Sequence, residues 1–431
     1  MKFKCQVESF IDGILAAVDV SSKGTIKEFY GVDKINVEAT KDNIVISAFG
    51  GKLGLTSTLS NVSVPSLNYV FDTAGKTTIS SKDLLSVLQS FDAIENVIVE
   101  LKEDKMTDTK ELIVSMEKDE EQFQTIPCFH AFIDIPVKTD KFAKELKIDK
   151  KVFISGIKKV MYAAGYETER PEFLVFALTA SKDTLRFSAG TGARHSIYEV
   201  EGKNIVEASP TDMVFMVPKD HTQAMLKALG SASSDVVVLK EAKKANDVPF
   251  HIVVECEPQD FILVGLDPSN KWPDENKVLG LDYKYKMVIK LGDLALAAKG
   301  TAATLNEQVK EDMKQGKKSH KAIFDIDVAK KSVNIKTNEY MRSSRKVALQ
   351  DVFTTDNNEM SFACVSSYLS EIVDQGDRNE YIQLEAIEAK KPIVVYFYAP
   401  EKVADEKTLK NVDKAKGYTE KFITFFGTYS I

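Results

Sequence analysis

The feature that most constrains the fold is a plan of elements that occurs three times along the chain. Each time, an amphipathic helix pattern is followed by alternating strands, a shorter helix pattern and further strands. At intervals of 144 and 142 residues, the long helices are predicted to start at Val7, Lys151 and Asp293. After a further 75, 68 and 72 residues, the short helices are predicted to start at Lys82, Lys219 and Val365. A period of this kind predicts three copies of one structural unit.

In the first copy, apolar residues recur at helical spacing and then at the alternating spacing of strands. The helical stripe consists of Val7, Phe10, Ile11, Ile14, Leu15 and Val18. Ser80 or Ser81 is expected to cap the short helix at 82–91. The predicted strands are 34–39, 44–49, 52–59, 96–102 and 111–116.

The second copy has the clearest pattern. Its helical stripe is Phe153, Ile157, Val160, Met161 and Ala164, with Asp149 as the expected N-cap and Gly165 as the expected stop. Leu174, Phe176 and Leu178, then Leu185, Phe187 and Ala189, alternate around Lys182-Asp183 and predict a hairpin. The short helix is expected to open at Pro218 and close at Gly230. Strands are predicted at 236–239, 251–256 and 261–264.

The third copy repeats both helix patterns and contains two segments that fit no element. The stripe of its long helix is Leu294, Ala297, Ala298, Thr301, Ala302 and Leu305. That of its short helix is Val365, Tyr368, Leu369, Ile372 and Val373. The polar segments 310–321 and 401–420 are interpreted as insertions, solvated loops outside the cores.

The chain has 431 residues, more than one hydrophobic core usually fills. With 44% hydrophobic and 28% charged residues it is typical of globular proteins, and the predicted class is α+β, with helices on one face of antiparallel sheet. The repeat places domain boundaries at 1–136, 137–280 and 281–431. No signal peptide or membrane span is evident, so a cytoplasmic location is expected. The four cysteines are far apart, which predicts buried reduced thiols.

Patterns that indicate catalysis are scarce. The five histidines lack metal-ligand spacing, and no serine stands in a G-x-S-x-G elbow. Gly190-Thr191-Gly192 lacks the Lys-Ser/Thr of a phosphate-binding loop and is interpreted as a strand-to-strand turn that needs glycine geometry. The chain is therefore predicted not to be an enzyme, and no cofactor or metal is expected.

Lysines gather on the predicted helices although the net charge is −7. A basic helix face would meet phosphates without reading bases, so these residues are predicted to form a basic lining. The set is Lys23, Lys82, Lys150, Lys151, Lys158, Lys159, Lys219, Lys227 and Lys299. The last short helix is different, because Glu371 and Asp374 make it acidic.

Two stretches carry a resemblance to a known family. One contains ETERP at 167–171 and LRFSAGTGARHSIYEV at 185–200, and the other is DFILVGLDPSNKWPDENKVL at 260–279. The chain resembles the bacterial-type β sliding clamps, the DNA polymerase III beta subunit family. The resemblance implies a ring of two chains, head to tail, each with three clamp-type domains. Such a ring is a processivity factor that encircles duplex DNA and tethers a replicative DNA polymerase, and a clamp-loader ATPase would be a further partner.

The resemblance also implies site residues. A partner-binding cleft would comprise Phe173, Gly192, Arg194, His195, Pro273, Lys277, Val278, Phe425, Tyr429 and Ile431. The homodimer contact would include Phe123, Thr304 and Leu305. The family's Thr-Asp-Gly-His-Arg-Leu is replaced by residues 190–195, and its C-terminal Met-Pro-Met-Arg-Leu by residues 427–431. A reshaped cleft is therefore expected, and with it a peptide that differs from the bacterial Gln-Leu-x-Leu-Phe type.

Two other function classes fit the residues. A tandem-repeat, β-rich structural or assembly protein would share the domain pattern without retaining DNA. A hydrolase would need a titratable cluster in a deep pocket. The divergence suits either a phage protein or one from a remote bacterial lineage.

Overall fold

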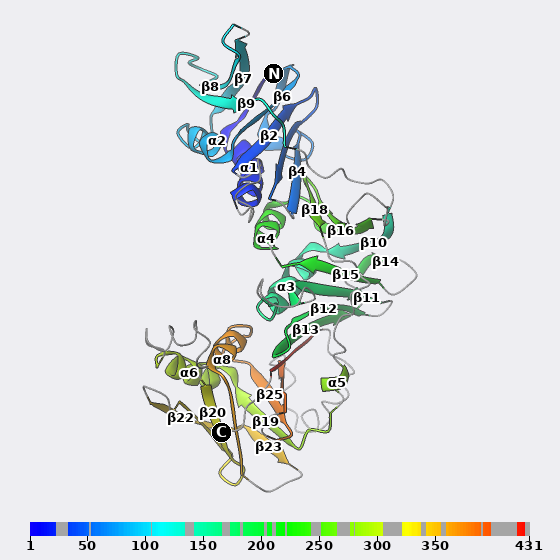
Figure 1. Cartoon of the computed structure of the whole chain (residues 1–431), viewed down its shortest axis with the longest axis vertical. Coiled ribbons are helices and arrows are strands. Elements are labelled where there is room, and N and C mark those ends of the chain that lie inside the picture. Colours follow the sequence, from blue (N-terminus) through cyan, green and yellow to red (C-terminus); the bar gives the residue numbers. More distant parts are fainter. Residues whose placement is uncertain are drawn as a thin grey trace. The chain divides into compact units, whose positions relative to one another are not determined.

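The computed structural model is drawn in Figure 1. It describes residues 1–22, 33–50, 53–104, 106–133, 142–165, 173–181, 184–201, 205–208, 213–219, 222–242, 251–264, 276–279, 281–304, 321–337, 342–354, 359–388, 391–397 and 420–426. The chain divides into two compact units. Unit 1 is Met1–Ser155, Thr179–Lys182 and Gly202–Asn270, and unit 2 is Gly156–Leu178, Asp183–Glu201 and Lys271–Ile431. Because this division passes through 137–280, the three domain boundaries stay a prediction.

Three pairs of one long and one short helix confirm the repeat of helices. The long helices are α1 (Val7–Ser22), α3 (Lys150–Met161) and α6 (Leu291–Ala302). The short helices are α2 (Ser81–Leu88), α4 (Thr222–Ser231) and α8 (Ser366–Val373). Two further pieces are the 3₁₀ turn η1 (Pro65–Leu67) and the single turn α5 (Asn276–Leu279). None of the helices in the described part of the chain is long and apolar enough to cross a membrane.

Unit 1 contains one continuous antiparallel sheet of 14 strands. Its order is β14-β10-β16-β17-β18-β4-β3-β2-β6-β9-β8-β7-β1-β5. The strands are β1 (Lys2–Gln6), β2 (Lys34–Ala39), β3 (Ile44–Phe49), β4 (Leu53–Leu59), β5 (Val70–Thr73), β6 (Gly75–Ser80), β7 (Asn96–Asp104), β8 (Thr109–Met116), β9 (Phe123–Phe129), β10 (Phe142–Asp149), β14 (Ile205–Ala208), β16 (Val236–Ala242), β17 (His251–Cys256) and β18 (Gln259–Val264). The unit also contains β15 (Met213–Pro218). The sheet stays continuous because β18 pairs with β4, with Phe261 opposite Leu55.

Unit 2 contains the remaining strands. In one sheet, the strands of this unit run in the order β11-β12-β13-β27-β26-β25-β19-β23, and a four-stranded sheet has the order β22-β21-β20-β24. These strands are β11 (Val175–Ala180), β12 (Thr184–Gly190), β13 (Arg194–Glu201), β19 (Tyr285–Lys290), β20 (Lys321–Asp327), β21 (Ser332–Thr337), β22 (Ser343–Ala348), β23 (Asp351–Thr354), β24 (Met360–Val365), β25 (Tyr381–Ala386), β26 (Ile393–Phe397) and β27 (Glu420–Phe426). The predicted α+β class with antiparallel sheets is confirmed.

Local signals explain where the helices begin. The side chain of Asp149 accepts a hydrogen bond from the Val152 amide at 3.0 Å, which confirms it as the cap of α3. Ser80 caps α2 in the same way, accepting from the Asp83 amide at 3.3 Å. At both positions a strand ends in a residue whose oxygen satisfies a free helical amide, so the chain turns from strand directly into helix.

Each helix buries its apolar stripe. Phe153, Ile157 and Val160 are buried in α3, and Phe10 and Ile14 are buried in α1, which contacts β3 and β4. In unit 2, α6 and α8 pack on each other and share one core with β19, β20 and β25. These contacts remove large apolar surfaces from water, which is the main favourable term in folding.

Several predicted boundaries differ from the structure. α4 begins at Thr222 instead of Lys219, because Pro218 is the last residue of β15, and Gly230 lies inside the helix. α3 ends at Met161, before Gly165, although the Ala163 and Ala164 amides still donate to carbonyls three residues back. Of the two insertions, Lys321 begins β20 and Glu420 begins β27, and the other residues lie outside the described part.

Candidate functional site

The ladder between β13 and β27 organises the region where the cleft was predicted. The two strands are antiparallel, with Ser196 opposite Thr424 and Ile197 opposite Ile423. Since successive side chains of a strand point to opposite faces, Arg194 and Ser196 share one face, and His195 and Ile197 the other. The predicted cleft residues Arg194 and His195 therefore point in opposite directions.

Arg194 points to the face that carries helix α8. Its guanidinium forms an ion pair with Glu371 and lies over the Tyr368 ring, 5.1 Å from the ring centre. On the same face, the Ser196 hydroxyl donates to the Lys159 carbonyl at 3.3 Å. Arg194 is thus placed to hold α8 against β13, and its side chain is 8% exposed.

A buried hydroxyl chain extends this contact. Tyr162 donates to the Thr424 hydroxyl at 2.8 Å, and Thr424 donates to the His195 carbonyl at 2.8 Å. Burial raises the pKa of Tyr162 to about 12. The hydroxyls are therefore satisfied inside unit 2, and they join the end of α3 to both strands of the ladder.

The opposite face carries a small apolar cluster. Ile197, Tyr283, Val394 and Ile423 form its buried part, and half-buried Val278, Leu279, Ile387 and Tyr396 pack against them. The Tyr283 hydroxyl donates to the Val278 carbonyl at 2.9 Å, which fixes α5 on the cluster. Leu281, 39% exposed, follows α5 in sequence. We name this set the α5 cluster.

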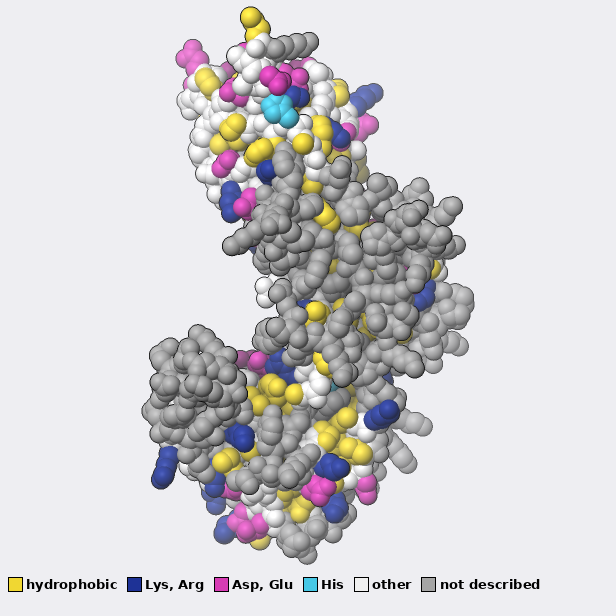
Figure 2. All heavy atoms as spheres, in the orientation of Figure 1, with side chains coloured by type: hydrophobic (Ala, Val, Ile, Leu, Met, Phe, Trp, Pro, Cys, Tyr) yellow, Lys and Arg dark blue, Asp and Glu magenta, His cyan; other side chains and the backbone are white. Residues whose placement is uncertain are grey.

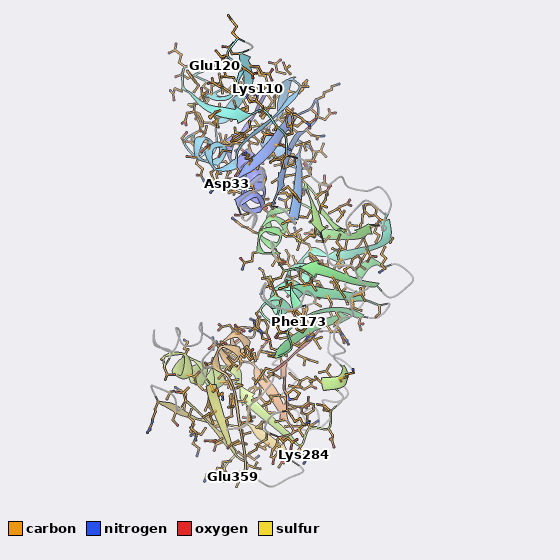
Figure 3. All side chains as sticks on the ribbon, viewed as in Figure 1. Asp33, Lys110, Glu120, Phe173, Lys284 and Glu359 are labelled. Carbon is orange, nitrogen blue, oxygen red and sulfur yellow. The ribbon has the colours of Figure 1, made fainter. Side chains whose placement is uncertain are left out.

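The structure brings some predicted cleft residues to this cluster. Val278 belongs to it, Lys277 is exposed beside it in α5, and His195 is buried on the same face of β13 as Ile197. Phe425 is opposite His195 in the ladder. Phe173, labelled in Figure 3, is half-buried just before β11. Pro273, Tyr429 and Ile431 lie outside the described residues.

The turn at 190–193 joins β12 to β13, as predicted. The Thr191 hydroxyl accepts from the Ala193 amide at 3.1 Å and the Thr191 amide donates to the Arg194 carbonyl at 2.7 Å. A side chain at Gly190 would overlap the His195 ring, whereas Gly192 faces open space. Glycine is required at Gly190 for close approach, and Gly192 is exposed.

The predicted DNA-facing lysines have different environments. Lys82, Lys151, Lys158, Lys227 and Lys299 are exposed. Lys150 is 12% exposed and donates to the Ala232 carbonyl at 2.7 Å. Lys159 donates to the Gln375 carbonyl and lies over the Phe422 ring, and Lys219 is half-buried. Lys23 lies outside the described residues. In Figure 2, Lys and Arg side chains lie among Asp and Glu side chains on the visible described surface.

The residues predicted at the homodimer contact also have different environments. Phe123 is 57% exposed at the start of β9, which is unusual for a large apolar side chain. Thr304 is buried and donates to the Thr301 carbonyl at 2.6 Å. Leu305 lies outside the described residues.

The sequence did not predict one hollow in the structure. It has a volume of about 520 Å³ and lies in unit 1, where β4 meets β18. Its polar lining includes Thr58, Ser60, Ser63, Glu255, Glu257 and Asp260. Because these residues come from two segments about 200 residues apart in sequence, no local pattern could indicate the hollow.

The described residues contain no group of three metal-binding side chains. All four cysteines are free, and burial raises the pKa of Cys256 to about 11 and of Cys364 to about 12. Such thiols are protonated at neutral pH and are poor nucleophiles.

No protein-family model matches the chain, and no curated protein matches it by sequence. Solved structures do match. The DNA polymerase sliding clamp from Bacillus subtilis aligns with a TM-score of 0.77 at 11% identity, over 100% of this chain and 99% of that one. The putative DNA polymerase III beta subunit from Eubacterium rectale (0.75, 15%) and the sliding clamp from Pseudomonas aeruginosa with ligand (0.76, 14%) each align over 100% of both chains. Over its whole length, the chain therefore has the fold of the DNA polymerase III beta sliding clamps.

Proposed function

We propose that this protein is a DNA sliding clamp, a processivity factor that encircles duplex DNA as a homodimer and tethers the replicative polymerase. The fold it shares along its whole length with sliding clamps supports this function. Such a clamp acts in the cytoplasm, is loaded by a clamp-loader ATPase, and performs no reaction itself. The observation that carries the proposal is the pattern of strand junctions.

Two junctions inside the chain are equivalent. In the first, β4 pairs with β18, and in the second, β13 pairs with β27. β4 and β13 are the third strand after a long helix, and β18 and β27 are the last strand of a repeat. In the third repeat, the strand equivalent to β4 and β13 is β22. In the first repeat, the strand equivalent to β18 and β27 is β9.

β22 and β9 retain pairing capacity in the described structure. β22 ends its sheet, and its backbone carries exposed Arg345 and Lys346 side chains. β9 pairs with β8 along one edge, and along its other edge it pairs with β6 at Cys128 and Phe129 alone among the described residues. The rest of that second edge, which begins at exposed Phe123, is available to another strand. An unpaired edge is a template for another strand. We infer that β22 of one chain pairs with β9 of a second copy, and that two such junctions close a ring.

The helices supply the DNA-facing surface in this proposal. Exposed Lys151, Lys158 and Lys299 would meet phosphates, together with Lys23 and Lys219. Lys150 and Lys159 are engaged by backbone carbonyls, and Lys82 and Lys227 pair with Asp33 and Asp19, so these four would contribute less. The dimer contact would include Phe123, Thr304 and Leu305.

The α5 cluster is the proposed floor of the partner-binding cleft. Its half-buried apolar side chains could accept the apolar residues of a polymerase or clamp-loader peptide. His195, Lys277 and Val278 would line it, together with Phe173, Gly192, Pro273, Phe425, Tyr429 and Ile431. Arg194 would contribute from the opposite face of β13, where it holds α8 against the strand.

Retention on DNA tests the proposal. After verified loading on nicked circular DNA, we expect the protein to stay bound through a high-salt wash and to leave when the circle is cut. Loss from the intact circle in the same wash would end the clamp proposal. A structural or assembly protein held by charge alone would give that result. Solution mass is a second test, since the ring requires a dimer.

A further inference from the structure

The two junctions inside the chain carry ion pairs of opposite polarity. At the first junction, α1 packs against α4, and the Lys227 ammonium lies 2.8 Å from an Asp19 carboxylate oxygen. The anion is on the repeat that contributes β4, and the cation on the repeat that contributes β18.

At the second junction the signs are reversed. Arg194 of β13 pairs with Glu371 of α8, and Lys159 donates to the Gln375 carbonyl just beyond the end of that helix. Two cations therefore come from the repeat that contributes β13, and the anion comes from the repeat that contributes β27. A cation at a helix C-terminus is also favoured by the helix dipole.

The ion-pair residues of α4 and α8 occupy one equivalent position. Lys227 is the sixth residue of α4, Glu371 the sixth of α8, and Ser86 the sixth of α2. The position is therefore cationic in the second repeat, anionic in the third and uncharged in the first. Ser86 is exposed.

We propose that this alternation of charge is an address that selects which repeat joins which. If α8 met α1, anionic Glu371 would approach the repeat that carries Asp19, and if α4 of one copy met β13 of another, cationic Lys227 would approach the repeat that carries Arg194 and Lys159. Both wrong contacts bring like charges together, whereas both native contacts bring opposite charges together. Repeats with similar strand edges need such discrimination, because any free edge can accept any partner strand. The address inside the chain does not depend on DNA binding, and only its extension to β22 and β9 rests on the proposed ring.

The effect of one site is modest but sufficient to bias assembly. An exposed pair such as Lys227 and Asp19 changes an equilibrium by a factor of about 1.5 to 5. A wrong contact is repulsive where the native contact is attractive. The ratio of the population with native contacts to the population with wrong contacts therefore changes by a factor on the order of ten. Salt screens this difference between exposed charges.

Refolding from urea tests the address with no DNA or peptide present. The key variant is Asp19→Lys/Lys227→Glu, which keeps an ion pair but gives the first junction the polarity of the second. We expect its urea midpoint to match that of the original chain, while species heavier than the native one increase several-fold in size-exclusion chromatography with light scattering. Lys227→Glu alone should lower the midpoint and increase the same species.

The matched control is Glu103→Lys/Lys110→Glu, which swaps a cross-strand pair between β7 and β8, outside the junctions. It should refold like the original chain. If the Asp19/Lys227 swap also refolds like the original chain, the pair is merely structural and the address is refuted. Should that swap fail to fold, Asp19→Asn/Lys227→Gln at low salt decides: an unchanged fraction of heavy species refutes the address, and an increased fraction supports it. A failed retention assay with a positive refolding result would refute the clamp and leave the address standing.

Discussion

Replacing Arg194 by Met should loosen α8 from β13 without unfolding the sheet. Breaking a fully buried ion pair costs about 3–5 kcal/mol, and breaking an exposed one about 0.2–1 kcal/mol. Arg194 is 8% exposed but Glu371 is 33% exposed, so the abandoned carboxylate can reach water. Loss of the contact with Tyr368 adds about 0.5–1 kcal/mol. We therefore expect a total cost of about 2–3 kcal/mol.

Native-state hydrogen exchange measures this cost locally. The amides of α8 should exchange about 30- to 150-fold faster in Arg194→Met, because each 1.4 kcal/mol is a factor of ten. A double-mutant cycle with Glu371→Gln should give a coupling energy of about 1–2 kcal/mol. Arg378→Met is the control, since Arg378 pairs with Asp374 at 3.1 Å with both side chains well exposed.

The reasoning would be refuted if Arg194→Met exchanged no faster than Arg378→Met. A coupling energy below about 0.3 kcal/mol would have the same meaning, because surface pairs reach that value. Either result would show that Arg194 does not hold the second junction together.

Four other predictions can be checked directly. Phe123→Ala with Leu305→Ala should shift dimer toward monomer in sedimentation at sub-micromolar concentration, and an intact dimer would contradict the proposed contact. Deleting 429–431 should abolish binding of polymerase or clamp-loader peptides in a fluorescence titration while solution mass stays unchanged, and unchanged affinity would remove the cleft from that place. Burial raises the pKa of Tyr162 to about 12, so the unfolded chain loses this proton at a lower pH than the folded chain. The free energy of unfolding should therefore fall as pH rises from about 10 to 12, and in urea titrations over that range Tyr162→Phe should lose less stability than the original chain. Cys128, the half-buried cysteine, should react first with a thiol reagent in the native protein, and earlier labelling of Cys5 would contradict the burial described here.

Periodicity in the sequence determined the helix pairs and several of the strands. Strands at 34–39, 44–49 and 251–256 match to the residue, and all three helix pairs occur where the repeat predicts them. This succeeds because the stripe of a helix and the alternation of a strand are properties of a few successive residues. The cap at Asp149 is local in the same sense, since it joins residues three apart.

The tertiary structure alone decided what each face meets. Arg194 and His195 are neighbours in sequence and entered one predicted cleft, yet β13 sends them to opposite faces. Lys159 and Lys150 have the sequence pattern of solvent-exposed helix lysines, but their ammonium groups donate to the backbone carbonyls of Gln375 and Ala232. Tyr162 meets Thr424 across 262 residues. Spacing along a chain fixes which way a side chain points, whereas its partner depends on which strands pair, and that is set by the burial of surfaces far apart in sequence.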